Sequence, residues 1–85
     1  MVITNNSHFR TADTALAAYL VTEGFGTPSI DNEGNEGKRS YFIFSKHTPK
    51  MTKAIEEWDA ARATTNAVLF FNAYQNLLRR IREKY

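Results

Sequence analysis

Cysteine is absent from the 85 residues, and the only histidines are His8 and His47. Without cysteine no disulfide can form, which favours a reducing compartment, so we expect a cytoplasmic protein. The usual thiolate ligands of a structural zinc site are also missing, and the two histidines do not form a His-x-x-x-His pair. We therefore expect no metal site and no cofactor, and we interpret both histidines as surface or capping residues.

Long hydrophobic runs are also lacking. The longest apolar stretch is too short to cross a bilayer, and residues 1–10 have neither the charged nor the apolar segment of a signal peptide. The composition, with 42% hydrophobic and 13% aromatic residues, is that of a folded globular protein. We expect residues 1–85 to form one domain with a modest core and no membrane partner.

Motifs of catalysis are missing as well. The segment 32–40 has the Gly-Lys pair of a phosphate-binding loop, but its first glycine is absent and Arg39 stands where Ser or Thr would bind magnesium. A nucleophile elbow is also absent. Three acidic residues gather on one predicted helix, each three or four residues from a base, which is typical of surface ion pairs rather than a catalytic dyad: Glu56, Glu57 and Asp59. We expect a non-enzymatic protein.

Residues 11–25 (TADTALAAYLVTEGF) predict an amphipathic helix, because apolar side chains recur in them at helical spacing. Thr11 is interpreted as the N-cap, with Asp13 in the first turn, where a negative charge suits the helix dipole. Gly24 can adopt the left-handed conformation after the last turn. Phe25 can then fold back on the helix in a Schellman ending.

Strand patterns occur at 2–4, 7–9, 27–31 and 39–45, and the segment 32–38 is predicted to form a long hairpin tip. In the last strand both alternating sets of side chains are apolar. This strand is therefore expected to be central and at least partly covered on both faces. The two sets are Tyr41 with Ile43, and Phe42 with Phe44.

Two helices are predicted to follow. Thr48 and Pro49 form a strong helix start, and Thr65 or Asn66 is expected to cap the final helix. The order is β-α-β-β-α-α, so we predict an α+β fold with a small antiparallel or mixed sheet packed with helices. The apolar stripe of the final helix includes Phe70 and Phe71. The expected shared core is Leu16, Leu20, Phe42, Phe44, Trp58, Tyr74, Leu77 and Ile81.

Charge is unevenly distributed along the chain. Residues 1–37 hold one base and five acids, a net −4, whereas residues 38–85 hold ten bases and four acids, a net +6. Two basic clusters suggest an anionic macromolecule, although cations at a helix end also complement its dipole without any partner. The predicted macromolecule-binding residues are Lys46, Lys50, Lys53, Arg79, Arg80, Arg82 and Lys84.

The combination of residues 11–25, YFIFSKHTP at 41–49, EEW at 56–58 and FNAYQNLLRRI at 71–81 resembles a family of short prokaryotic and phage proteins with a domain of unknown function. This resemblance implies a phage or mobile-element setting but no activity and no catalytic residues. The chain departs from the family in its longer hairpin tip and in ARATT at 61–65, where a turn residue such as glycine is expected.

Three functional hypotheses follow. The first is a phage-type accessory protein that binds a host or defence macromolecule, either a protein or a ribonucleoprotein; an inhibitor of the anti-CRISPR kind is one form. The second is direct binding of DNA or RNA through the two basic clusters. The third is a structural role through self-association as a homodimer, since some apolar residues lie outside the expected core. These residues are Tyr41, Ile43, Val68 and Leu69.

Overall fold

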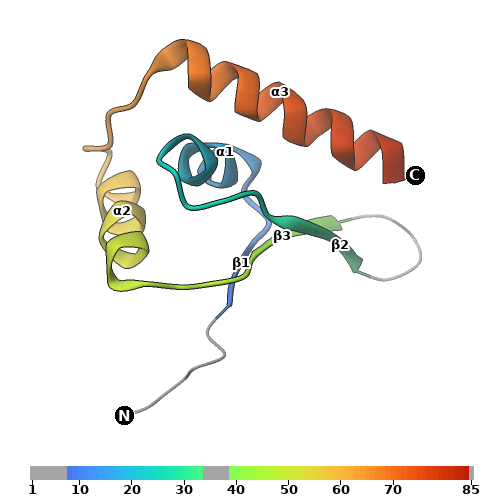
Figure 1. Cartoon of the computed structure of the whole chain (residues 1–85), viewed down its shortest axis with the longest axis horizontal. Coiled ribbons are helices and arrows are strands. Elements are labelled where there is room, and N and C mark those ends of the chain that lie inside the picture. Colours follow the sequence, from blue (N-terminus) through green and yellow to red (C-terminus); the bar gives the residue numbers. More distant parts are fainter. Residues whose placement is uncertain (1–7, 34–38, 85) are drawn as a thin grey trace.

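The computed structural model describes residues 8–33 and 39–84. The elements run in the predicted order, β-α-β-β-α-α, which confirms the α+β class (Figure 1). The expected strand at 2–4 and residues 34–38 of the expected hairpin tip lie outside the described residues. The elements are β1 (Phe9–Thr11), α1 (Thr14–Thr22), β2 (Ser29–Glu33), β3 (Arg39–Phe44), α2 (Pro49–Asp59) and α3 (Ala67–Lys84).

The three strands form an antiparallel sheet in the order β1-β3-β2, so β3 is the central strand, as predicted. Phe44 pairs with Phe9 of β1, and Phe42 pairs with Ile30 of β2. Phe42 and Phe44 are fully buried, whereas Tyr41 on the other face is half-buried. The β-branched and aromatic residues of β3 thus bring two rings into the core.

The second face of the sheet is partly covered by a side chain that crosses the central strand. The Arg10 guanidinium of β1 lies over the Tyr41 ring, 3.9 Å from its centroid. Its Nη2 approaches Asp31 Oδ2 of β2 at 3.6 Å. Both charged side chains are about half exposed, so this pair contributes little to stability. The Arg10 side chain provides the partial cover that was expected on this face of the sheet.

Helix α1 is the centre of the molecule and lies between the sheet and α3 (Figure 1). Five consecutive residues, 16–20, are buried. Because successive side chains point about 100° apart, five of them cover the whole circumference of a helix. The predicted amphipathic helix is therefore wrong in one respect: α1 is covered on all sides here. Ala17 and Ala18 lack bulky side chains, which allows neighbouring elements to approach closely.

The start of α1 differs from the prediction by two residues. Asp13, not Thr11, is the N-cap, and its Oδ1 accepts hydrogen bonds from the backbone N–H groups of Ala15 (3.0 Å) and Leu16 (3.2 Å). Thr11 supports the cap instead, because its Oγ1 accepts from the Asp13 N–H at 3.0 Å. A carboxylate at this position satisfies two N–H groups that have no partner within the helix.

The end of α1 has the predicted Schellman geometry. Gly24 has φ of +92°. The Phe25 N–H donates to the Leu20 carbonyl and the Gly24 N–H to the Val21 carbonyl, both at 3.1 Å. Phe25 packs, half-buried, against the core. Residues 20–25 therefore specify their own turn, since each interaction is local in sequence.

Helix α2 begins as predicted, with Thr48 Oγ1 accepting from the Met51 N–H at 3.2 Å and Pro49 in the first turn. Its end has Schellman hydrogen bonds without a glycine. The Arg62 N–H donates to the Glu57 carbonyl at 2.8 Å and the Ala61 N–H to the Trp58 carbonyl at 3.0 Å. Ala61 has φ of +61° and is the first residue of the segment 61–65, where the family resemblance led us to expect a turn residue such as glycine.

Helix α3 is capped by Asn66, whose Oδ1 accepts from the Leu69 N–H at 3.0 Å. Of the eight residues expected in the core, five are buried, while Trp58, Tyr74 and Ile81 are half-buried against them. Phe71 was expected on the apolar stripe, but 59% of it is exposed. Its side chain leaves the helix in a direction that turns away from the buried side of α3.

Candidate nucleic-acid interface on α3

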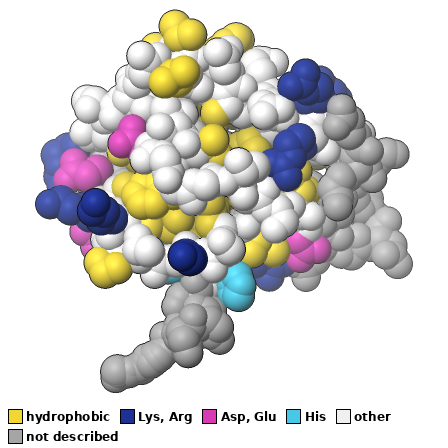
Figure 2. Space-filling model, in the orientation of Figure 1, with side chains coloured by type: hydrophobic (Ala, Val, Ile, Leu, Met, Phe, Trp, Pro, Cys, Tyr) yellow, Lys and Arg dark blue, Asp and Glu magenta, His cyan; other side chains and the backbone are white. Residues whose placement is uncertain are grey.

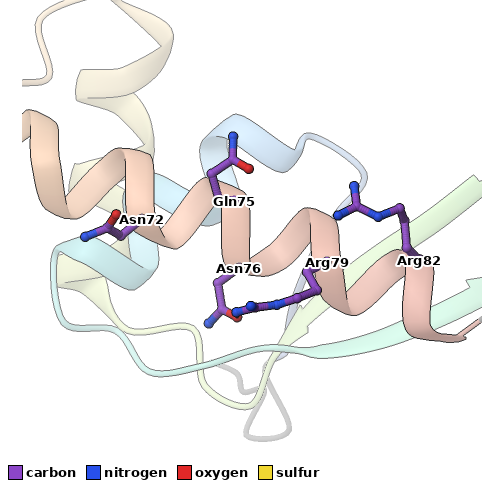
Figure 3. A pocket seen from close by; sticks show the side chains of 5 residues that line it. All are labelled: Asn72, Gln75, Asn76, Arg79 and Arg82. Atoms are coloured by element: carbon purple, nitrogen blue, oxygen red, sulfur yellow. The ribbon is translucent and has the colours of Figure 1, made fainter.

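The outward face of α3 carries a row of polar side chains that we call the polar stripe. Its members line a shallow hollow and follow one another at helical spacings of i, i+3, i+4, i+7 and i+10, so they share one side of the helix (Figure 3). All five are exposed: Asn72, Gln75, Asn76, Arg79 and Arg82.

The polar stripe is partly ordered by its own contacts. Arg79 Nη2 donates to Asn76 Oδ1 at 2.9 Å, one helical turn away, and Figure 3 shows this guanidinium reaching along the helix toward the amide. Within the part of the chain that the structure describes, no carboxylate pairs with Arg79 or Arg82. The sequence of α3 contains a single acidic residue, Glu83. Both guanidinium groups are therefore available for an anion.

The chemistry of the polar stripe combines two kinds of groups. Asn and Gln amides both donate and accept hydrogen bonds, whereas guanidinium groups only donate. Amides of this kind bond to adenine, and Arg bonds to guanine or phosphate. The sequence prediction missed Asn72, Gln75 and Asn76, because it searched for charge alone. Their spacing with Arg79 was the signal that could have found them.

Arg80 was predicted to bind a macromolecule together with its neighbours, but the structure turns it inward. Its Nη2 donates to the Pro28 carbonyl oxygen at 2.9 Å, and its Nη1 is buried without a hydrogen-bond partner. The helical position explains this, because Arg80 follows the buried Leu77 by three residues and so shares its side of α3. Arg80 is thus placed between α3 and the sheet, away from Arg79 and Arg82. The side chain of Lys84 lies outside what the structure describes.

The second predicted cluster, Lys46, Lys50 and Lys53, is exposed around the start of α2. In Figure 2, basic side chains gather beside α2 on the left and beside the C-terminal half of α3 on the upper right. The structure therefore does not join this cluster to the polar stripe. His47 is exposed just before α2, and its Nε2 lies 3.0 Å from Thr52 Oγ1.

The residues predicted for self-association are also divided between two surfaces. Tyr41 and Ile43 lie half-buried on the open face of the sheet. Val68 and Leu69 lie on the first turn of α3, where 68% and 56% of them are exposed. Because α1 lies between the sheet and α3, the two pairs do not form one patch. Figure 2 shows hydrophobic side chains at the top of the view, over the first turns of α3.

These features define a small α+β protein with a three-stranded antiparallel sheet and an exposed polar face on its last helix. The chain belongs to the family of a domain of unknown function, DUF5659, whose model matches residues 6–83. No curated protein and no solved structure matched the chain. Among the described helices, none has the length and apolar character needed to cross a membrane.

Proposed function

We propose that this protein is a non-enzymatic DNA-binding protein that places the outward face of α3 against duplex DNA. The observation that supports this most is the polar stripe, in which three amides and two arginines share one exposed helix face. The major groove of B-DNA admits an α-helix, and amides and guanidinium groups are the side chains that read its base edges. The major groove of duplex RNA is too deep and narrow for a helix, so DNA is the favoured partner.

The position of α3 suits this role. It is an 18-residue helix, about 27 Å long, packed on α1 by one side while its other side faces outward. Arg79 and Arg82 lie in its C-terminal half and would contact phosphates or guanine. Asn72 and Gln75 lie nearer its middle and would contact base edges.

The first experiment measures binding of a labelled DNA duplex at two salt concentrations. Binding should weaken steeply with salt, because each neutralised phosphate releases counterions. The double variant Arg79→Ala/Arg82→Ala should bind more weakly and should flatten the salt slope by up to about 1.8 units if both arginines contact phosphates. Arg62→Ala is the matched control, because this exposed arginine lies outside the polar stripe.

A second experiment separates base reading from charge. Duplex sites that bind tightly are first selected from a random pool with the wild-type protein. Replacing both Asn72 and Gln75 by Ala should abolish the higher affinity for these sites over unselected DNA. The salt slope should stay unchanged. Equal binding by the arginine variant and the wild type, or preference for an RNA duplex, would show that α3 is not a DNA-reading helix.

The setting of the protein is a further part of the proposal. We propose a cytoplasmic location from the lack of cysteine, and a phage or mobile-element origin from the resemblance described above. In that setting, binding to DNA would be one way to act on a host or defence macromolecule. Homodimer formation also stays a prediction; sedimentation at micromolar concentration distinguishes a dimer from the 9.7 kDa monomer.

A further inference from the structure

A second hollow lies where α1 and α2 end and α3 begins, and it is lined mainly by apolar and aromatic groups. We call it the aromatic hollow. Its volume is about 730 Å³, within the range typical of ligand sites. The polar stripe lies farther along α3, so the two sites do not share a residue. The lining residues of the aromatic hollow are Tyr19, Trp58, Ala63, Thr64, Thr65, Ala67, Phe70 and Phe71.

A row of rings forms the base of the aromatic hollow. The Tyr19 and Trp58 ring centroids are 5.1 Å apart, and those of Trp58 and Phe70 are 6.3 Å apart. Tyr74 extends the row beyond the hollow, at 6.2 Å from Phe70. The faces of such rings carry negative electrostatic potential and attract cations. The row therefore favours a ligand that is apolar and also carries a positive charge.

Two carboxylates stand at the edge of this row. Glu23 ends α1, and its Oε2 accepts a hydrogen bond from Thr65 Oγ1, a lining residue, at 2.9 Å. Glu57 lies beside Trp58 on α2, with its Oε1 3.6 Å from Arg62 Nε. Burial raises the pKa of the Tyr19 hydroxyl most, and the charges of Glu23 and Glu57 raise it further. Both carboxylates therefore act electrostatically on the hollow.

The ends of two helices add to the negative electrostatic potential of the aromatic hollow. Both α1 and α2 finish here, at the C-caps Glu23 and Ala60, and a helix C-terminus carries partial negative charge. The base Arg62, which follows the end of α2, is engaged with Glu57. The start of α3 opposes this with its N–H groups, but the Asn66 side chain accepts from one of them.

We propose that the aromatic hollow binds a segment of a partner protein that presents an arginine or lysine between apolar residues. The cation would stack on the Trp58 and Phe70 rings near Glu23, and the apolar neighbours would cover Phe71, which is 59% exposed. An apolar centre with charges at its edge is the usual composition of a protein interface. The aromatic hollow and the polar stripe share no lining residue, and this proposal does not rest on DNA binding by the polar stripe.

The experiment selects 12-residue peptides from a random displayed library against the whole protein. The best peptide is then synthesised with its cationic residue and with citrulline, an uncharged analogue of arginine, in the same place. Trp58 is the single tryptophan, so its fluorescence reports occupancy of the hollow directly. We expect selected peptides to carry a base beside apolar residues, a saturable fluorescence change, and at least about tenfold weaker binding of the citrulline form.

Two exposed residues supply the variants. Phe71→Ala and Glu23→Gln should each weaken the selected peptide several-fold, with melting curves like the wild type. The control Glu56→Gln, an exposed acid on α2 that does not line the hollow, should leave binding unchanged. Equal binding of the citrulline form, or of both variants, would overturn the proposal. A concentration-dependent dimer that Phe71→Ala abolishes would also overturn it, because the hollow would then bind a second copy of the chain. A change in Trp58 fluorescence with duplex DNA alone would overturn it as well, because the hollow would then bind nucleic acid.

Discussion

The Arg80 guanidinium on α3 donates a hydrogen bond to the carbonyl oxygen of Pro28, a residue 52 positions earlier. Pro28 immediately precedes β2 and is among the most deeply buried side chains. This hydrogen bond links the last helix to the residue that precedes β2. Arg80 therefore has a structural role, unlike the exposed Arg79 and Arg82 near it in the sequence.

Replacing Arg80 should therefore affect folding, whereas replacing Arg79 should not. Arg80→Ala removes a charged hydrogen-bond donor from a buried carbonyl and should lower the free energy of unfolding by about 1.5–3 kcal/mol. Arg79→Ala, on the exposed face, should change it by less than about 0.5 kcal/mol. Urea denaturation of both variants measures the difference. Similar values for the two would mean that the Pro28 contact contributes nothing.

Replacing Ala61 by glycine should stabilise the folded protein. Its φ of +61° places its Cβ too close to the neighbouring carbonyl oxygen, a strain of roughly 1–2 kcal/mol that glycine lacks. The greater flexibility of glycine in the unfolded chain offsets part of this gain, so Ala61→Gly should raise the free energy of unfolding by about 1 kcal/mol. Ala60, with φ of −86°, is the matched control, and its glycine variant should be neutral or destabilising. A gain at Ala60 and none at Ala61 would contradict the assignment.

Two aromatic residues that were expected in the core, Phe44 and Trp58, should differ in their effect on stability. Phe44 is 1% exposed, so Phe44→Ala should lower the free energy of unfolding by about 3–5 kcal/mol, enough to unfold a domain of this size. Trp58 is only half-buried, so Trp58→Ala should have a smaller effect, about 1–3 kcal/mol, mainly from lost ring contacts. Thermal melts followed by circular dichroism decide this. An unchanged melt for Trp58→Ala would exclude it from the core.

Stability should fall in alkaline solution through Tyr19. Its pKa is raised above the ordinary value of 10.0, first by burial and then by Glu23 and Glu57. The folded state therefore holds this proton more tightly than the unfolded state. The resulting stabilisation is fully present below pH 10 and is lost as the pH rises through the raised pKa. Tyr19→Phe should show a smaller loss of unfolding free energy above pH 10 in denaturant titrations; an identical loss would exclude Tyr19 as the cause.

Local sequence predicted the features that local interactions create. The Thr48-Pro49 helix start and the Gly24-Phe25 ending each involve residues within one turn, so their geometry follows from the residues themselves. The central place of β3 was also predictable, because apolar residues on both faces of a strand need cover on both.

The features that sequence did not predict depend on where whole elements lie. Burial of α1 on all sides requires α3 to pack on it from a distant part of the chain, and no pattern within residues 11–25 reports that. The exposure of Phe71 and the inward turn of Arg80 follow from how α3 is rotated on α1. The polar stripe was missed for the same reason, because its side chains become a group only once the outward face of α3 is known.

The central position of α1 also determines when the molecule can be completed during synthesis. Residues 14–22 leave the ribosome before the helix that covers one of their sides, which comprises residues 67–84. Until α3 has emerged, one side of α1 remains open to water and to other nascent chains. The fold therefore closes only after residues 67–84 have been made, and a chain stopped before residue 67 would expose the apolar side chains of an incomplete core to chaperones.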